Sequence, residues 1–243
     1  TMEEKKPGPE EAALMILALP ERPAPDLTKA LVDKQQEDGS WNPAGQFANM
    51  QKRGEPDARA NSTRLALLAL ASARPTRLEF DAARTKADAV LQKTAPPTSM
   101  ESLVFRALYA RRLGRAKEAD ALTNKIVKEQ RGDGGWSSFL GENMSDPLAT
   151  GQALYALQSS STEPTTTDAI ARGQNWLLKT QRDDGSWPID VSHISKMDRS
   201  APAKAKSSRE VQALYTYWGC SWATLGLLQG ISIVEKEGGK TSP

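Results

Sequence analysis

The sequence contains a single cysteine, Cys220, and a single histidine, His193. One cysteine cannot form a disulfide within the chain, and one cysteine with one histidine cannot complete a zinc site built only from those residue types. A disulfide framework and a Cys/His zinc cage are therefore both excluded. The cysteine content leaves the redox compartment open.

Net charge and long apolar runs are also lacking. The 32 Lys and Arg residues and 30 Asp and Glu residues give a formal net charge of +2, which provides no overall field to attract nucleic acid or an anionic membrane. No apolar run approaches the roughly 20 residues that cross a bilayer, so we expect no transmembrane segment. With 38% hydrophobic and 26% charged residues, we predict one soluble domain over residues 1–243, with flexible tails at 1–8 and 235–243.

Apolar residues recur at intervals of three and four along nearly the whole chain. This is the spacing of α-helices, and no stretch shows the alternation of a β-strand. About nine helical segments result, and they are of two kinds. Segments such as 117–130 are charged on one face, whereas segments such as 60–72 and 146–158 are nearly apolar all round. Alternating outer and inner helices predict an all-α fold of stacked helical hairpins.

A seven-residue frame from glutamine to tryptophan closes three of the outer segments. It reads QQEDGSW at 35–41, QRGDGGW at 130–136 and QRDDGSW at 181–187. The Asp-Gly pair predicts a tight turn, and we expect the glutamine to bond the backbone of a neighbouring helix while the tryptophan covers the turn. Three copies of one group indicate a structural joint and not catalysis. The staple residues are Gln35, Trp41, Gln130, Trp136, Gln181 and Trp187.

These frames resemble the QW motifs of squalene-hopene cyclases. The inner segments STRLALLALAS (62–72) and ATGQALYALQS (149–159) are similar to the inner helices of the wider terpenoid cyclase and protein prenyltransferase superfamily. The resemblance covers most of the chain, from residue 25 to residue 230. It implies an α/α toroid, which with about nine helices is an incomplete (α/α)6-type barrel.

Proton-donating cyclases of this superfamily carry an Asp-x-Asp-Asp signature just before a threonine on an inner helix. Ahead of Thr63 the three acidic positions hold Arg59, Asn61 and Ser62. Ahead of Thr150 they hold Asp146, Leu148 and Ala149. In the last repeat they hold Tyr217, Gly219 and Cys220. Asp146 is thus the only catalytic candidate. Because Asp-Pro is an ordinary helix start, an N-cap explains Asp146 better than catalysis does.

The zinc pattern of the protein prenyltransferases is also incomplete. Cys220 matches their cysteine, but the companion aspartate two residues earlier is Trp218, and His193 lies in a loop instead of on the next inner helix. We therefore expect no metal site and no cofactor.

Ligand-binding residues are expected at the rim where loops lead into inner helices. The loops at 42–60 and 188–212 are long for a compact domain, which indicates either a functional or a disordered segment. The loop at 188–212 is basic and holds the only histidine, so it either binds an anionic partner or is simply solvated. The aromatic residues near this rim either line the central hollow or fill the core. The rim candidates are Arg59, Asn61, Asp146, Thr150, His193, Tyr217, Trp218 and Trp222.

The sequence therefore favours a non-catalytic toroid that binds a hydrophobic or anionic ligand or docks a protein. The alternative is an isoprenoid-active enzyme, resembling a terpene cyclase or a prenyltransferase, with a non-standard acid such as Asp146. Similar QW-repeat domains accompany c-type cytochrome modules in bacterial proteins, which implies a bacterial chain with a redox partner in the periplasm. The residues themselves leave cytoplasm and periplasm open, and without a Cys-x-x-Cys-His motif the chain would hold no haem itself.

Overall fold

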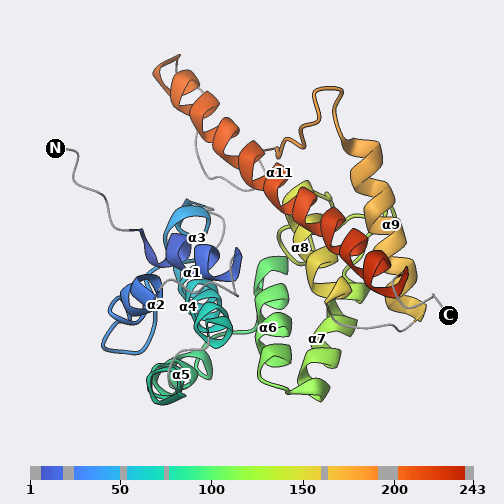
Figure 1. Cartoon of the computed structure of the whole chain (residues 1–243). Helices are drawn as coiled ribbons and strands as arrows, with labels where there is room; N and C mark the ends of the chain where they lie inside the picture. Colours follow the sequence, from blue (N-terminus) through green and yellow to red (C-terminus); the bar gives the residue numbers. More distant parts are fainter. Residues whose placement is uncertain are drawn as a thin grey trace. The chain divides into compact units, whose positions relative to one another are not determined.

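The computed structural model describes residues 7–18, 25–49, 54–73, 77–159, 164–190 and 202–238. In these ranges the chain forms ten helices and no strand, apart from an isolated bridge between Ser99 and Phe139 (Figure 1). The predicted all-α fold is confirmed, and the succession of helical hairpins is consistent with an α/α toroid. Within the same ranges, no helix combines the length and apolarity needed to cross a membrane.

The chain divides into two compact units, which we describe one at a time. Unit 1 comprises residues 1–97 with 112–114, and unit 2 comprises residues 98–111 with 115–243. A single domain over 1–243 stays a prediction. Of the predicted tails, residues 1–6 and 239–243 lie outside the described residues.

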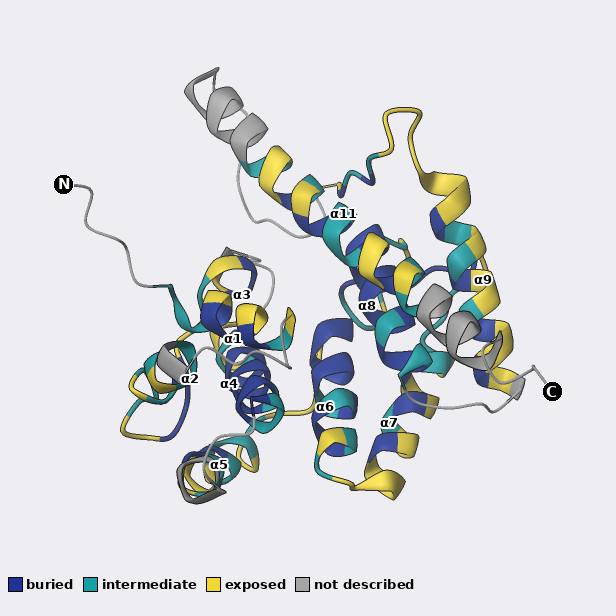
Figure 2. Cartoon of the chain, in the orientation of Figure 1, coloured by how far each residue is buried: buried dark blue, intermediate teal, exposed yellow. Residues whose placement is uncertain are grey.

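The described part of unit 1 contains five helices arranged around one buried helix. They are α1 (Pro9–Ala18), α2 (Pro25–Val32), α3 (Gly45–Asn49), α4 (Glu55–Ser72) and α5 (Arg77–Leu91). Every residue of α4 from Ala60 to Leu67 is buried, as the dark ribbon of Figure 2 shows. The other four helices of the unit all contact α4. Its alanine-rich surface lets neighbours approach from several sides, so α4 is the inner helix that its all-round apolar sequence predicts.

Unit 2 is built around a second buried helix. Its described helices are α6 (Met100–Arg112), α7 (Ala116–Lys128), α8 (Pro147–Gln158), α9 (Pro164–Thr180) and α11 (Pro202–Gly238). In α8 every residue from Pro147 to Leu154 is buried, and α7, α9 and α11 contact this helix. By contrast, α7 buries only Ala119, Thr123 and Ile126, which lie on one face. The inner and outer kinds of helix expected from the sequence are both present.

The inner helices α8 and α11 cross at two glycines. A Cβ atom at Gly151 would overlap the carbonyl of Trp222, and one at Gly226 would lie 2.7 Å from the carbonyl oxygen of Gly151. The Gln158 amide Nε2 donates a hydrogen bond to the Gly226 carbonyl at 2.6 Å. The two helices therefore pack almost backbone to backbone, which only residues without a side chain allow.

The two long loops predicted from the sequence are shorter than expected. The segment 42–60 contains α3, and α4 already begins at Glu55 because Pro56 lies in its first turn, where proline favours a helix. The segment 188–212 ends earlier too, since α11 begins at Pro202. Residues 191–201, which include His193, lie outside the described residues.

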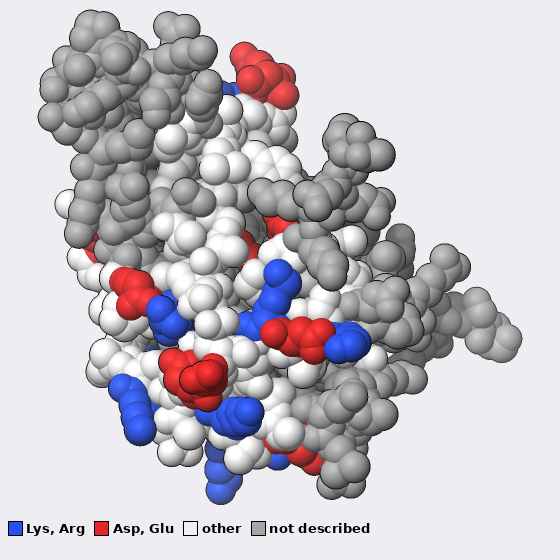
Figure 3. All heavy atoms as spheres, turned by 90° about the vertical axis from the view of Figure 1, so that its left-hand side faces the viewer, with Lys and Arg blue, Asp and Glu red and all other residues white. Residues whose placement is uncertain are grey.

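Charges of both signs are mixed on the face shown in Figure 3, among the atoms that the structure describes. Several neighbours on outer helices form ion pairs, such as Lys29 with Asp33 at 2.8 Å and Arg172 with Asp168 at 3.1 Å. These side chains are largely exposed, so each pair contributes at most about 1 kcal/mol to stability. Neither sign of charge dominates the described part of the face in Figure 3.

Candidate functional site

The three glutamine-to-tryptophan frames form joints between helices: joint 1 (35–41), joint 2 (130–136) and joint 3 (181–187). In joint 2, the Gln130 Nε2 donates to the carbonyls of Gly134 and of Ala169 on α9, both at 2.8 Å. The same two bonds in joint 1, both 2.9 Å long, link Gln35 to Gly39 and to Ala83 on α5. Each of these glutamines closes its own turn and ties one outer helix to the next.

Each tryptophan ties its joint back to the outer helix that precedes it. The indole Nε1 donates to the carbonyl of the residue four positions before the glutamine. These bonds run from Trp41 to Leu31 at 2.8 Å, from Trp136 to Ile126 at 2.7 Å and from Trp187 to Leu177 at 2.8 Å. All three side chains are buried, so the indole donors are satisfied inside the protein.

The backbone N–H of each tryptophan is bonded to the following inner helix. The acceptor is Thr63 Oγ1 at 3.1 Å for Trp41 and Thr150 Oγ1 at 3.0 Å for Trp136. For Trp187 it is Cys220 Sγ at 3.2 Å. Cys220 therefore takes the threonine position, and the alignment that placed it one position earlier was wrong by one residue. The acid positions of the last repeat fall on Thr216, Trp218 and Gly219.

The aspartate and glycine of each joint form the turn itself. Hydrogen bonds from Ser40 hold the pKa of Asp38 below its ordinary value, and hydrogen bonds from Ser186 do the same for Asp184. The glycine after each aspartate has a positive φ; the values are 93° at Gly39, 96° at Gly134 and 80° at Gly185. These carboxylates are therefore held as charged turn-forming groups.

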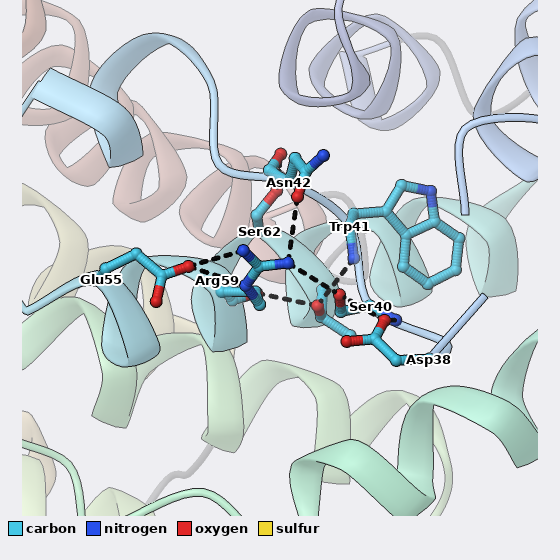
Figure 4. Close-up of polar contacts among 8 residues, drawn as sticks. Asp38, Ser40, Trp41, Asn42, Glu55, Arg59 and Ser62 are labelled. Atoms are coloured by element: carbon cyan, nitrogen blue, oxygen red, sulfur yellow. Dashed lines mark hydrogen bonds and ion pairs between the residues drawn. The ribbon is translucent and has the colours of Figure 1, made fainter. Parts of the chain in front are cut away.

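In unit 1, the start of the inner helix α4 carries an arginine that binds the preceding joint. Figure 4 shows the Arg59 guanidinium between Glu55 and Asn42. Its Nε donates to Glu55 Oε1 at 2.8 Å, and its Nη1 donates to Asn42 Oδ1 at 3.0 Å. Ser62 Oγ donates to the Asn42 carbonyl at 3.1 Å, and Asn61 is completely buried. This cluster fastens the end of joint 1 to α4.

In unit 2, the equivalent position at the start of α8 is Asp146. Its Oδ1 accepts from the Ala149 N–H at 2.8 Å, as in a helix N-cap, and its Oδ2 accepts from the Ser138 N–H at 2.7 Å. Burial raises the pKa of Asp146 above its ordinary value, although these hydrogen bonds oppose the rise. The Asp146 carboxyl thus caps α8, and its burial disfavours its ionisation.

Asp146 borders a pocket of about 230 Å³ in unit 2. We call it the Trp176 pocket. One wall comes from the segment 137–147, the second from Trp176 and Thr180 of α9, and the third from residues 187–190. The pocket therefore lies between joints 2 and 3, beside the C-terminal end of α9.

An aromatic cluster packs between the inner helices of unit 2. The Trp222 ring of α11 meets Phe105 of α6 and Tyr155 of α8 edge to face, with ring centroids 6.3 and 6.1 Å apart. Burial raises the pKa of the Tyr155 hydroxyl. Trp218 packs on Tyr215 at 5.0 Å in the same manner. These residues provide packing between inner helices.

The predicted rim residues are distributed over the two units and one undescribed segment. Arg59 and Asn61 belong to unit 1, whereas Asp146, Thr150 and Trp222 belong to unit 2. Thr150 is buried as the acceptor of joint 2, Trp218 is buried, and Tyr217 is 66% exposed. His193 lies outside the described residues. Of the predicted rim residues that the structure describes, Asp146 alone lines the Trp176 pocket.

Sequence reasoning missed the remaining walls of this pocket. Trp176 lies on an outer helix, where its Nε1 donates to Asp133 Oδ2 of joint 2 at 3.2 Å. The sequence signal that could have indicated this wall is the aromatic residue Trp176 on the charged face of α9. Among the described residues, no group of three His, Cys, Asp or Glu side chains could hold a metal ion.

No protein-family model matches the chain. A stretch of 83 residues is 37% identical to copalyl diphosphate synthase from Streptomyces cyslabdanicus, and this stretch covers 34% of the chain but 14% of that enzyme. The fold is similar to the crystal structure of a possible GH105-family member from Salmonella enterica serovar Paratyphi A. The TM-score is 0.60 at 11% sequence identity, over 92% of this chain and 71% of that one. The first likeness is a weak similarity to a terpene cyclase, and the second concerns the fold alone.

Proposed function

We propose that this chain is a non-catalytic helical-repeat module that docks a helix pair of a protein partner on the exposed side of α11. We call this side the docking face. Apart from the adjacent pair Thr224 and Leu225, its residues follow one another at separations of three, four or seven, which places them on one side of the helix. They are Leu214, Tyr217, Thr224, Leu225 and Leu228.

The observation that carries the proposal is the equivalence of α8 and α11. Thr150 and Cys220 perform the same task in joints 2 and 3, so Tyr155 corresponds to Leu225. Five and eight residues after the joint contact, α8 meets the next inner helix, through the Tyr155 ring on Trp222 and the Gln158 bond to Gly226. In α11 the same two positions hold Leu225 and Leu228, which are 45% and 51% exposed.

The outer layer has a corresponding open position at joint 3. Gln181 Nε2 bonds the Gly185 carbonyl at 3.0 Å, and within the described residues it has no second acceptor like Ala169 in joint 2. Leu178, one turn before it, is 60% exposed. A further outer helix at this place would supply a backbone carbonyl to Gln181 and would cover Leu178.

The chemistry of the partner follows from the composition of α11. No charged residue occurs from Val211 to Val234, so the docking face suits an uncharged helix. Leu178, Leu225 and Leu228 are about half exposed, so their burial contributes about 0.8–1.5 kcal/mol each, half of the value for a fully exposed leucine. The sum of about 2–5 kcal/mol is at the low end of the cost of association, about 4–15 kcal/mol. We therefore expect the partner to bond Gln181 as well as to cover the leucines.

Site-specific photocrosslinking tests this function. Tyr217→p-benzoylphenylalanine places the crosslinker on the docking face, and Lys117→p-benzoylphenylalanine places it on the exposed side of α7 as a matched control. In the host cells, we expect one protein to crosslink at position 217 and not at position 117. The additional exchange Leu228→Glu should abolish the product while circular dichroism stays unchanged.

Equal products at both positions, no product at 217, or crosslinks only between copies of this chain would contradict the proposal. The same experiment tests the partner class expected from the resemblance, because a c-type cytochrome module would bring haem absorbance into the crosslinked product. The periplasmic location stays a prediction.

A second candidate function is an isoprenoid-active enzyme in which Asp146 is the acid. Two observations favour it: the similarity to copalyl diphosphate synthase and the burial that raises the pKa of Asp146. The Trp176 pocket weighs against it, because a volume of about 230 Å³ is below the usual range of about 300–1,000 Å³ for ligand pockets. Incubation with geranylgeranyl diphosphate and analysis of the products, both cyclic diphosphates and hydrocarbons, tests it. Product formation that Asp146→Asn abolishes would replace the docking proposal.

A further inference from the structure

We propose that the Trp176 pocket binds a small organic cation, an ammonium group on a compact apolar body. This inference does not depend on the docking face, since the pocket lining and the docking face share no residue. It rests on the charges, the hydrogen-bond inventory and the rings that the pocket presents.

Every ionisable side chain among the described residues that line the pocket is acidic. The three are Glu142, Asp146 and Asp190, and no described lining residue is a lysine, an arginine or a histidine. Carboxylates in a partly enclosed cleft attract a cation and repel a phosphate or a carboxylate. This lining therefore opposes the anionic ligand that the basic segment 188–212 suggested.

Four side-chain hydrogen-bond donors around the pocket are already engaged. The indole N–H groups of Trp176 and Trp187 donate to Asp133 and Leu177, so both rings offer only apolar and π surface. Ser145 Oγ donates to Asp133 Oδ1 at 2.8 Å, and Thr180 Oγ1 donates to the Trp176 carbonyl at 2.8 Å. A site rich in acceptors and poor in free donors matches a ligand that donates, such as an ammonium group.

Ser138 adds a buried acceptor to this inventory. Its residue is 6% exposed, and its Oγ makes no hydrogen bond of acceptable geometry. The hydroxyl nevertheless lies close enough to Asp146 to oppose the rise in the pKa of that carboxyl. A ligand N–H directed at the Asp146 carboxylate would therefore find the Ser138 oxygen beside it.

The remaining walls suit the apolar body of such a ligand. Trp176 and Trp187 contribute aromatic surface, to which cations are attracted through the ring quadrupole. Pro147, Pro188 and Ile189 complete the apolar lining. A volume of about 230 Å³ accommodates a ligand with a few heavy atoms.

Calorimetric titration of the full chain with three molecules of nearly equal shape tests the inference. The probes are tert-butylammonium, the neutral tert-butanol and the anionic pivalate, at low ionic strength. We expect tert-butylammonium to bind at least tenfold more tightly than either of the others, and its affinity to fall when salt is added. Binding of tert-butanol or pivalate with equal affinity, or no heat for any probe, would overturn the inference.

Two substitutions in the pocket and one control locate the binding. Asp146→Asn keeps a residue that caps helices well but removes the charge, and Trp176→Leu removes the ring. Each should weaken tert-butylammonium binding about tenfold, because a charge or a cation–π contact is lost. Asp184→Asn removes one negative charge from joint 3, outside the pocket, and should leave the affinity within twofold. An equal loss in all three variants, or no loss in the first two, would contradict this site.

Discussion

Replacing Gln130 by alanine is expected to destabilise unit 2 more than the same exchange at Gln181. Both glutamines close a turn by bonding a glycine carbonyl, at 2.8 and 3.0 Å. Gln130 alone has a second bond, at 2.8 Å, to the Ala169 carbonyl on the next outer helix. Comparing the two variants therefore measures the free energy of the hydrogen bond between the outer helices, because both glutamines belong to unit 2 and to the same sequence frame.

The expected difference follows from the number of bonds and their exposure. A net hydrogen bond contributes about 0.5–1.5 kcal/mol, so Gln130→Ala removes about 2 kcal/mol from the two bonds together. The buried Gln130 Oε1 has no partner in the described part of the chain, and its removal reduces this loss to about 1.5 kcal/mol. Gln181 is exposed and has one bond, so we expect Gln181→Ala to cost about 0.5 kcal/mol.

Urea denaturation followed by circular dichroism measures both free energies of unfolding. Thermal melting provides a second reading, since 1 kcal/mol lowers the melting temperature by about 2–4 °C in a chain of this size. Unchanged denaturant slopes would show that the same cooperative unit unfolds in both variants. If Gln181→Ala is as destabilising as Gln130→Ala, the bond to Ala169 does not hold the outer helices together.

Three further exchanges test the crossing, the cap and the joint contact in unit 2. Gly151→Ala should lower the free energy of unfolding by at least about 2 kcal/mol, because the new methyl meets the Trp222 carbonyl; Gly132→Ala, with nothing within 4 Å, is the control. In the wild type, the raised pKa of Asp146 in the folded state favours the protonated form, so the free energy of unfolding should fall as the pH rises above 3.8. Asp146→Asn should remove this fall, and urea titrations between pH 3 and 7 measure it. Cys220→Thr should stabilise the chain by up to about 1 kcal/mol in urea, since a hydroxyl accepts from an N–H better than sulfur does.

The helical architecture was predictable because its signals are local and repeated. Apolar spacing separates inner from outer helices, and α4 and α8 are buried as their alanine-rich sequences predict. The Asp-Gly pairs in the joints form the expected turns with a positive φ at glycine. In these cases each residue's task depends on its own helix or on the next turn, so one sequence contains enough information.

The start of α11 and the site in unit 2 were not predictable in the same way. The polar sequence ahead of Gln212 has no strong apolar period, yet the helix extends back to Pro202. The shift of the last repeat by one residue depends on the bond between Trp187 and Cys220, which are 33 positions apart. The pocket depends on Trp176 meeting two loops from different joints. Such contacts come from packing between repeats, which a periodic pattern does not encode.

The position four residues before the threonine that contacts each joint explains why resemblance to an enzyme and a docking role are compatible. Arg59 in unit 1 and Asp146 in unit 2 occupy the same place and carry opposite charges. Each bonds the residues just after the tryptophan of its joint, Arg59 through Asn42 and Asp146 through the Ser138 N–H. Their shared task is to fasten a joint to an inner helix, and either charge performs it. Asp146 also borders the Trp176 pocket, so we expect chemistry beyond fastening in unit 2.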